Sequence, residues 1–219
     1  MVSKPVRFKS SRPNGDVELE GRLHLPQEMP LRGGSVLCHP HPAGGGEMGV
    51  HLMVQIAEAL CSRGHAVLRF NFAGVGQSDG QFTDGAEEPY DVLSAAAYLE
   101  ALQDLAAGSV NLAGWSFGSW MALHALALGL ETPGLVSVAP PLAVYPFEEL
   151  PALLLDSRAK RYYLAGDRDT FCPVDTLLSF AAAISPSDAM NVMVLEGADH
   201  FFFGREQEVA DMVAEKICS

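Results

Sequence analysis

Short apolar runs alternate along the chain with longer stretches of mixed polarity, a pattern that predicts strands alternating with helices. The runs are bounded by Gly, Pro, Asn or Asp and predict strands over residues 5–10, 17–26, 35–39, 66–70, 109–113, 134–140, 159–166 and 191–197. The stretches between them predict helices over residues 51–63, 87–103, 117–130 and 205–217, and one that begins near Pro173. The fold class is therefore α/β, with a mostly parallel twisted sheet covered by helices on both faces.

Length and composition indicate one domain over residues 1–219. Of the 219 residues, 48% are hydrophobic and 19% are charged, which is enough for one substantial core and typical of a compact fold. We find no internal repeat, linker or low-complexity segment in the sequence.

Charge and cysteine usage limit the binding partners and the cellular compartment that we expect. The formal net charge of −13 disfavours nucleic-acid and anionic-membrane partners, since both bind basic surfaces. No apolar run reaches the roughly 18 residues of a membrane-spanning helix, so we expect no membrane insertion. Residues 1–16 lack the apolar core of a secretory signal, and the cysteines Cys38, Cys61, Cys172 and Cys218 lack C-x-x-C spacing. We expect free thiols, a cytoplasmic protein and no disulfide framework.

The motif G-x-S-x-G, typical of a serine nucleophile in a strand-to-helix turn, occurs twice. Ser116 follows the predicted strand 109–113 directly and precedes a run of good helix formers. Ser78 lies several residues past the strand that ends at Phe70, and no helix begins after it. We therefore predict Ser116 as the nucleophile and Ser78 as part of a glycine-rich loop.

A serine nucleophile needs a base, and the base needs an orienting acid. In serine hydrolases with this strand-to-helix turn, the acid and then the histidine follow the serine along the chain. His200 follows the last predicted strand and is the expected base, whereas His124 lies two turns into a helix and is expected in the core. The acid is Asp169 or Asp167, and we favour Asp169 because Asp167, next to the strand end, is placed to shape the turn.

The expected oxyanion hole consists of two backbone N–H groups. One is that of Phe117, directly after the nucleophile. The other comes from the loop after strand 35–39, where the prolines lack an N–H, so His41 is the favoured donor and Ala43 the second choice.

Five motifs in order, CHPHPAGGGEM, LRFNFAGVGQSDG, LAGWSFGSW, GDRDTFCP and GADHFF, resemble those of the small, lidless bacterial α/β-hydrolases related to dienelactone hydrolases. The resemblance covers nearly the whole chain. It implies the α/β-hydrolase fold, Asp169 rather than Asp167 as the acid, and His41 as the second oxyanion donor.

The segment between strands 134–140 and 159–166 has only about 18 residues, and relatives with a cap domain carry a larger insertion here. We therefore expect an open site without a sizeable cap, suited to small uncharged carboxylic esters and, as the alternative, to thioesters. The expected wall residues are Trp115, Val144, Tyr145, Phe147 and Phe201; ordinary core and rim packing is the other explanation for these side chains.

Two other classes of function remain to be weighed. A metal-dependent hydrolase could use His39 and His41 as an H-x-H pair, although no companion ligand motif follows them. A non-catalytic binding protein on the same fold would be expected to lack one of Ser116, Asp169 and His200. We expect a small-molecule substrate, no metal and no organic cofactor.

Overall fold

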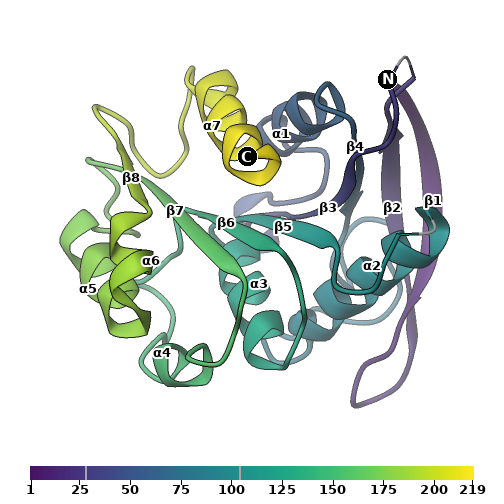
Figure 1. Cartoon of the computed structure of the whole chain (residues 1–219). Helices are drawn as coiled ribbons and strands as arrows, with labels where there is room; N and C mark the ends of the chain where they lie inside the picture. Colours follow the sequence, from purple (N-terminus) through teal and green to yellow (C-terminus); the bar gives the residue numbers. More distant parts are fainter. Residues whose placement is uncertain (28, 104) are drawn as a thin grey trace.

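Eight strands form one sheet in the order β1-β2-β4-β3-β5-β6-β7-β8 (Figure 1). The computed structural model describes residues 1–27, 29–103 and 105–219. The first two strands form an antiparallel hairpin, β2 is antiparallel to β4, and all later neighbours are parallel. The strands are β1 (Val2–Ser10), β2 (Val17–Leu25), β3 (Gly33–Cys38), β4 (His65–Phe70), β5 (Val110–Trp115), β6 (Gly134–Val138), β7 (Lys160–Gly166) and β8 (Val192–Leu195).

The central strands are buried on both faces, which explains their uninterrupted apolar sequences. Every residue of β4 and β5 is buried, as is all of β3 after its first residue. Because β3, β5, β6, β7 and β8 run parallel, their carboxyl ends meet at one edge of the sheet. The loops that follow these strands therefore gather at that edge, where sites in this class of sheet form.

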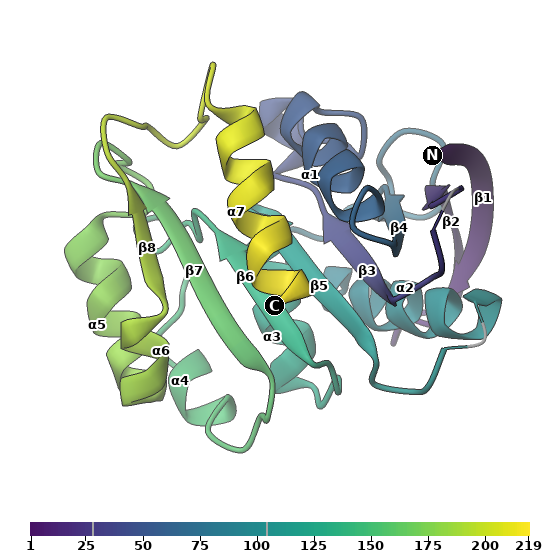
Figure 2. The ribbon, with the colours of Figure 1, turned by 45° about the horizontal axis from the view of Figure 1, so that its top comes forward.

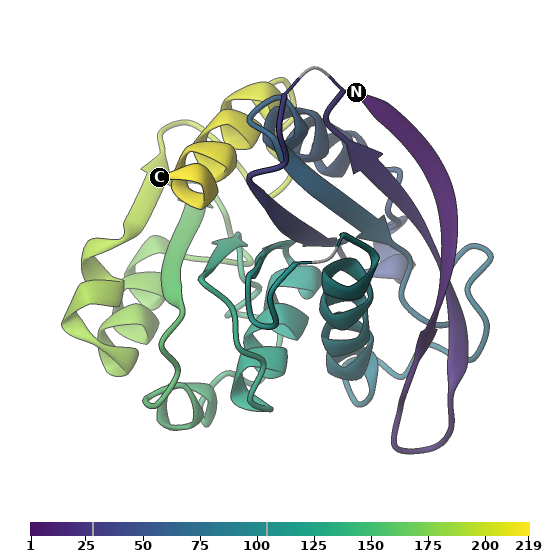
Figure 3. The ribbon, with the colours of Figure 1, turned by 45° about the vertical axis from the view of Figure 1, so that its right-hand side comes forward.

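Helices cover both faces of the sheet (Figures 1 and 2). On one face α1 (His51–Cys61) packs against α7 (Glu206–Cys218). On the other face α2 (Glu88–Gln103) packs against α3 (Phe117–Ala127), and Figure 3 shows α2 beside the β1–β2 hairpin. The second layer continues through α4 (Leu150–Leu153), α5 (Val174–Ile184) and α6 (Pro186–Met190).

The predicted fold class is confirmed, and most predicted elements agree with the structure to within a few residues. The helix expected over 117–130 ends at Ala127. Two short helices, α4 and α6, and a 3-10 turn at Pro42–Gly44 were not predicted, because three to five residues are too few to establish a period. Between β6 and β7 the only helix is α4, so no cap covers the sheet edge. Among the helices that the structure describes, none has the length and apolar content needed to span a bilayer.

A buried ion cluster joins the end of the hairpin to α2. The Arg12 guanidinium donates to both Asp91 carboxylate oxygens, at 2.8 and 2.6 Å, and lies 3.3 Å from Glu88 and 3.4 Å from Glu87. Asp91 also accepts the amide of Ala73 at 3.1 Å. The cluster thereby ties the turn between β1 and β2, α2 and the loop after β4 together without a single exposed partner.

His39 joins the carboxyl ends of β3 and β4. Its ring is fully buried, Nδ1–H donates to the Pro40 carbonyl at 2.7 Å, and Nε2 accepts the amide of Phe72 at 3.2 Å. Burial lowers the pKa of His39 to about 4, because a charged ring would be desolvated. The neutral ring is therefore part of the folded structure.

This burial makes stability depend on pH. A histidine in the unfolded chain has a pKa of about 6.5, above that of folded His39, so the unfolded state takes up the proton first. We expect the free energy of unfolding to fall as the pH decreases from about 6.5 to about 4. His39→Gln keeps a donor and an acceptor but does not titrate, and over this interval it should lose less stability than the wild type, by on the order of 2 kcal/mol.

Urea unfolding at several pH values measures the difference. Burial lowers the pKa of His24 to about 4 as well, so the stability of both the wild type and His39→Gln depends on pH through His24. The difference between their two stability curves is therefore the quantity that tests His39. His51→Gln, at an exposed position, is the matched control and should follow the wild type. Parallel curves for His39→Gln and wild type would contradict the assignment.

Candidate active site

Ser116 lies between β5 and α3 in a turn that leaves no room for a side chain at position 114 or position 118. Its backbone has φ +55° and ψ −121°, a conformation that residues other than glycine rarely adopt. A Cβ on Gly114 would overlap the carbonyl of Gly118, and one on Gly118 would overlap the carbonyl of Cys38. The amide of Ser116 donates to the Val138 carbonyl at 2.8 Å, so the neighbouring strand helps to maintain the strained turn.

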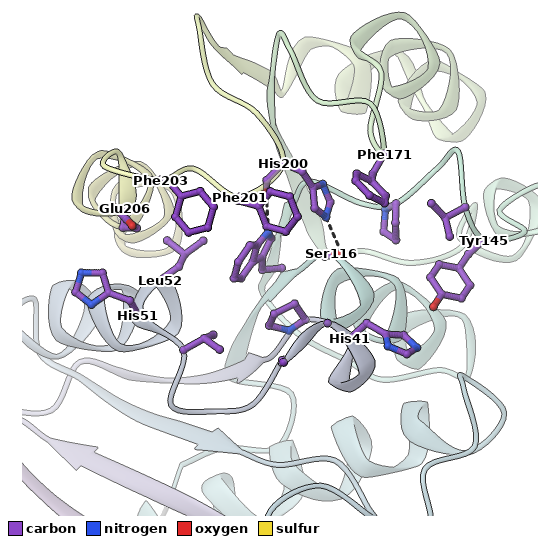
Figure 4. Close-up of a pocket in the computed structure, with 18 residues that line it drawn as sticks. His41, His51, Leu52, Ser116, Tyr145, Phe171, His200, Phe201, Phe203 and Glu206 are labelled. Atoms are coloured by element: carbon purple, nitrogen blue, oxygen red, sulfur yellow. Dashed lines mark hydrogen bonds between the residues drawn. The ribbon is translucent and has the colours of Figure 1, made fainter.

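A chain of hydrogen bonds leads from Ser116 into the protein. The Ser116 Oγ lies 2.9 Å from His200 Nε2, and His200 Nδ1 lies 2.8 Å from Asp169 Oδ2 (Figure 4). All three residues are buried, with exposed fractions of 9%, 6% and 5% respectively. Because Nδ1–H donates its hydrogen bond to Asp169, His200 Nε2 is left free to accept a hydrogen bond from the serine hydroxyl.

The two aspartates after β7 have different environments. Asp169 Oδ1 accepts the amides of Phe171 and Cys172 at 2.8 and 2.9 Å, which leaves Oδ2 for His200. Asp167 Oδ1 instead accepts the amide of Gly197 at 2.7 Å and joins the loop after β7 to the loop after β8. The structure therefore brings Asp169 to His200 and leaves Asp167 in the turn.

The loop that carries His200 is fixed by groups on both sides. Trp115 Nε1–H donates to the His200 carbonyl at 3.1 Å, and Asp199 Oδ1 accepts the amides of Phe201 and Phe202 at 3.0 and 3.2 Å. Phe202 is buried and has φ +54°. The role of Trp115 in holding this loop is additional to its expected place in the pocket wall.

The loop after β3 approaches Ser116 from the opposite side. Within the described ranges we find no protein acceptor for the amides of His41 and Phe117. The His41 side chain is engaged elsewhere: Nδ1 accepts the Ala43 amide at 3.0 Å, and Nε2–H donates to Asp84 at 3.0 Å. This pattern assigns the side chain to the shape of the loop and leaves the backbone amide at the site.

A cavity of about 520 Å³ opens above Ser116 and His200 and extends to both sides of them (Figure 4). Most of its wall is apolar, contributed by Val50, Leu52, Trp115, Val144, Phe171, Phe201 and Phe203. Tyr145, Gly44, Gly45 and Gly46 also line it. A largely apolar pocket with a few convergent polar groups is the usual form of a small-molecule site.

The prediction for Phe147 requires correction. Trp115, Val144, Tyr145 and Phe201 line the cavity as expected, but Phe147 does not. Its ring is buried below the surface, 6.1 Å from Trp120 and 5.4 Å from Phe180 between centroids. The chain turns inward after Tyr145, so a residue two positions later packs into the core.

Ser78 and His124, the alternatives rejected for the nucleophile and the base, lie outside the site. Ser78 is buried, its hydroxyl donates to the Asn71 carbonyl at 2.8 Å, and it accepts the Glu20 amide at 3.0 Å. The bond to Glu20 connects β2 to the loop after β4, and the bond to Asn71 lies within that loop. His124 lies in α3 with its ring on Trp120, 5.1 Å between centroids.

The H-x-H pair does not present two free imidazoles. Both nitrogens of His39 are bonded to Pro40 and Phe72, and both nitrogens of His41 to Ala43 and Asp84. Across the described part of the chain, His, Cys, Asp and Glu form no group of three suited to a metal ion.

Sequence reasoning missed several residues at the site. Asp84 contacts both His41 and Tyr145 and has φ +52°, but nothing in its local sequence indicates this. Phe171 lies 4.6 Å from His200 between ring centroids, and Phe203 lines the cavity. Both follow a predicted site residue within three positions, and that proximity was the available signal.

Comparison with known proteins agrees with this fold. Residues 34–216 match the family model described as "Alpha/beta hydrolase domain". An alpha-beta serine hydrolase homologue from Coxiella burnetii superposes with a TM-score of 0.81 and 29% identity, over 96% of each chain. A serine hydrolase without a lid from Xanthomonas campestris superposes with a TM-score of 0.79 and 24% identity, over 99% of this chain and 95% of that one, and shows the fold alone.

One curated relative is similar over part of its length. Palmitoyl-protein thioesterase ABHD10, mitochondrial, of Homo sapiens is 38% identical over 104 residues, which are 45% of this chain and 32% of that protein. The chain thus spans only about a third of that relative. The family match, in contrast, covers most of the chain. The protein belongs to the α/β hydrolase family.

Proposed function

We propose that the protein is a serine hydrolase that cleaves small uncharged carboxylic esters through an acyl-enzyme intermediate. The observation that carries this proposal is the hydrogen-bond chain from Ser116 through His200 to Asp169, buried at the floor of an apolar cavity. An activated serine, a positioned base and available backbone amides are the parts that acyl transfer requires. The similarity of the motifs to those of dienelactone hydrolase relatives supports it further.

In the first half-reaction, Ser116 Oγ attacks the ester carbonyl while its proton moves to His200 Nε2. The carbonyl oxygen becomes an oxyanion, for which the amides of Phe117 and His41 are the proposed donors. The intermediate collapses, the C–O bond to the leaving alkoxide breaks, and the leaving oxygen takes the proton from His200. Asp169 stabilises the imidazolium while it carries that proton.

In the second half-reaction, water repeats the sequence on the acyl-enzyme. His200 accepts a proton from water, the hydroxide adds to the acyl carbon, and the acyl–Oγ bond breaks with return of the proton to Ser116. The products are a carboxylic acid and an alcohol. Every proton and electron pair is supplied by ester, water and these side chains, so the reaction as proposed requires neither metal nor organic cofactor.

Thioester hydrolysis on the same residues is the second candidate. It is favoured by the partial similarity to relatives that carry the name palmitoyl-protein thioesterase. Matched oxygen and sulfur esters of one acyl group decide between the two, since the acyl-enzyme is identical and only the leaving atom differs.

We further propose a cytoplasmic location and a small-molecule substrate. The cysteines of the described chain are free thiols, three of them buried, as expected in a reducing compartment.

Ser116→Ala should lower kcat on 4-nitrophenyl acetate by on the order of 10⁴-fold or more, because it removes the nucleophile and leaves only binding and oxyanion contributions. Ser78→Ala is the matched control from the other G-x-S-x-G motif and should retain activity within about tenfold, although it loses two structural hydrogen bonds. Covalent labelling with an organophosphate and mass spectrometry identifies the reactive serine directly. Label on Ser78 with Ser116 unmodified would reverse the assignment.

Asp169→Asn should lower kcat by on the order of 10³–10⁴-fold with little change in KM, because the amide no longer holds His200 in the required tautomer. Asp167→Asn keeps an acceptor for the Gly197 amide, so it should cost at most about 1 kcal/mol of stability and leave kcat of the folded enzyme nearly unchanged. Steady-state kinetics and melting temperatures of the two variants, measured side by side, test both statements. A catalytically dead Asp167→Asn beside an active Asp169→Asn would require the roles to be exchanged.

A further inference from the structure

The cavity has two sides of different chemistry, and Ser116 lies between them (Figure 4). Leu52 and Phe203 lie on one side, where α1 and α7 begin; this is the α1–α7 side. His41 and Tyr145 lie on the other, the Tyr145 side. A substrate whose carbonyl is bound at Ser116 must place one of its two parts on each side.

The α1–α7 side is lined by apolar side chains next to Ser116. Leu52 is buried, whereas Phe203 is 78% exposed, and the rings of Phe201 and Phe203 are stacked with centroids 5.6 Å apart. The polar residues His51 and Glu206 come from the first turns of α1 and α7 at the outer end of this side. An apolar chain can therefore lie along this side with its end close to solvent.

The Tyr145 side combines hydrogen-bonding groups with the apolar side chains of Val144 and Phe171. Asp84 accepts from His41 Nε2–H at 3.0 Å and from the Tyr145 hydroxyl at 3.4 Å. Burial and the neighbouring Asp84 carboxylate raise the pKa of Tyr145 to about 12, so the hydroxyl stays protonated. Covering these groups with hydrocarbon would remove water from them without replacing its hydrogen bonds, which is costly.

We propose that the acyl chain lies on the α1–α7 side and the leaving group on the Tyr145 side, so that esters of unbranched, medium-length carboxylic acids are the preferred substrates. This inference rests on the proposed function and assigns its substrate class. At ~30 Å³ per non-hydrogen atom, 520 Å³ holds on the order of 17 atoms on both sides together. With an aromatic leaving group of about ten atoms, about seven atoms remain, the size of an acyl chain of roughly six to eight carbons.

The proposal predicts how the rate depends on acyl length. Each methylene that leaves water for the α1–α7 side should raise kcat/KM by about twofold to fourfold. The rise should continue from acetyl to about octanoyl and then level off, because a longer chain extends past His51 and Glu206 into solvent. A series of 4-nitrophenyl esters from acetyl to dodecanoyl, kept below the concentration at which the esters aggregate, measures it.

Substitution of one exposed wall residue on each side tests the two sides independently. Phe203→Ala should lower kcat/KM for the octanoyl ester by about fivefold and leave the acetyl ester within about twofold, since acetyl does not reach it. Val144, next to Tyr145 and 54% exposed, is the matched residue on the other side. Val144→Ala should keep the dependence on acyl length and change the ratio between phenyl acetate and methyl acetate. Met190→Ala, 86% exposed on α6 and away from the cavity wall, controls for nonspecific effects.

The outcomes are distinct. A length dependence that flattens in Phe203→Ala but not in Val144→Ala supports the proposal. A dependence that flattens in Val144→Ala instead, or a wild type that ignores acyl length while requiring Ser116, overturns it and leaves the proposed function standing. If no ester is hydrolysed, or if Ser116→Ala is as active as the wild type, the proposed function fails and this inference fails with it. Melting temperatures of the variants exclude loss of folding as the cause of any change.

Discussion

The first turn of α3 packs against the carboxyl end of β3 with no side chain between the two backbones, and the site depends on this contact. Gly118 permits it, because any larger residue would overlap the carbonyl of Cys38. The contact brings the amide of Phe117 next to the loop that contains His41. Since protein interiors are close-packed, a single extra methyl here would displace the helix and Ser116 with it. The strained backbone of Ser116 is maintained in the same way, by the packing and hydrogen bonds around it.

A second close approach positions the base. A Cβ on Gly166, the last residue of β7, would overlap the carbonyl of Ala198 in the loop after β8. Asp167 and Arg168 add hydrogen bonds to Gly197 and Ala198 across the same gap. The two loops therefore act as one unit, and the His200–Asp169 pair is oriented by backbone packing as much as by its own hydrogen bond.

How far the sequence predicted the site follows from where each residue lies along the chain. Ser116, Asp169 and His200 could be found because each lies at or within a few residues of the end of a predicted strand, and parallel strands bring such positions to one edge. Asp84 could not be found, because its contacts with His41 and Tyr145 depend on the path of a long irregular loop. Phe147 was misplaced for a related reason: residues 141–158 contain only a four-residue helix and give no period from which to assign inward and outward side chains. The fold class needed only the alternation of strands and helices, which survives small errors in their boundaries.

With a four-residue helix as the only helix between β6 and β7, the cavity opens without any element that must move. Enzymes that close a lid over the substrate expel water by that motion, and its reversal often limits turnover. Here the exposed rings of Phe201 and Phe203 remain in water until a ligand covers them. In the proposed reaction, exclusion of solvent from Ser116 therefore depends on the bound molecule, which would serve as its own lid.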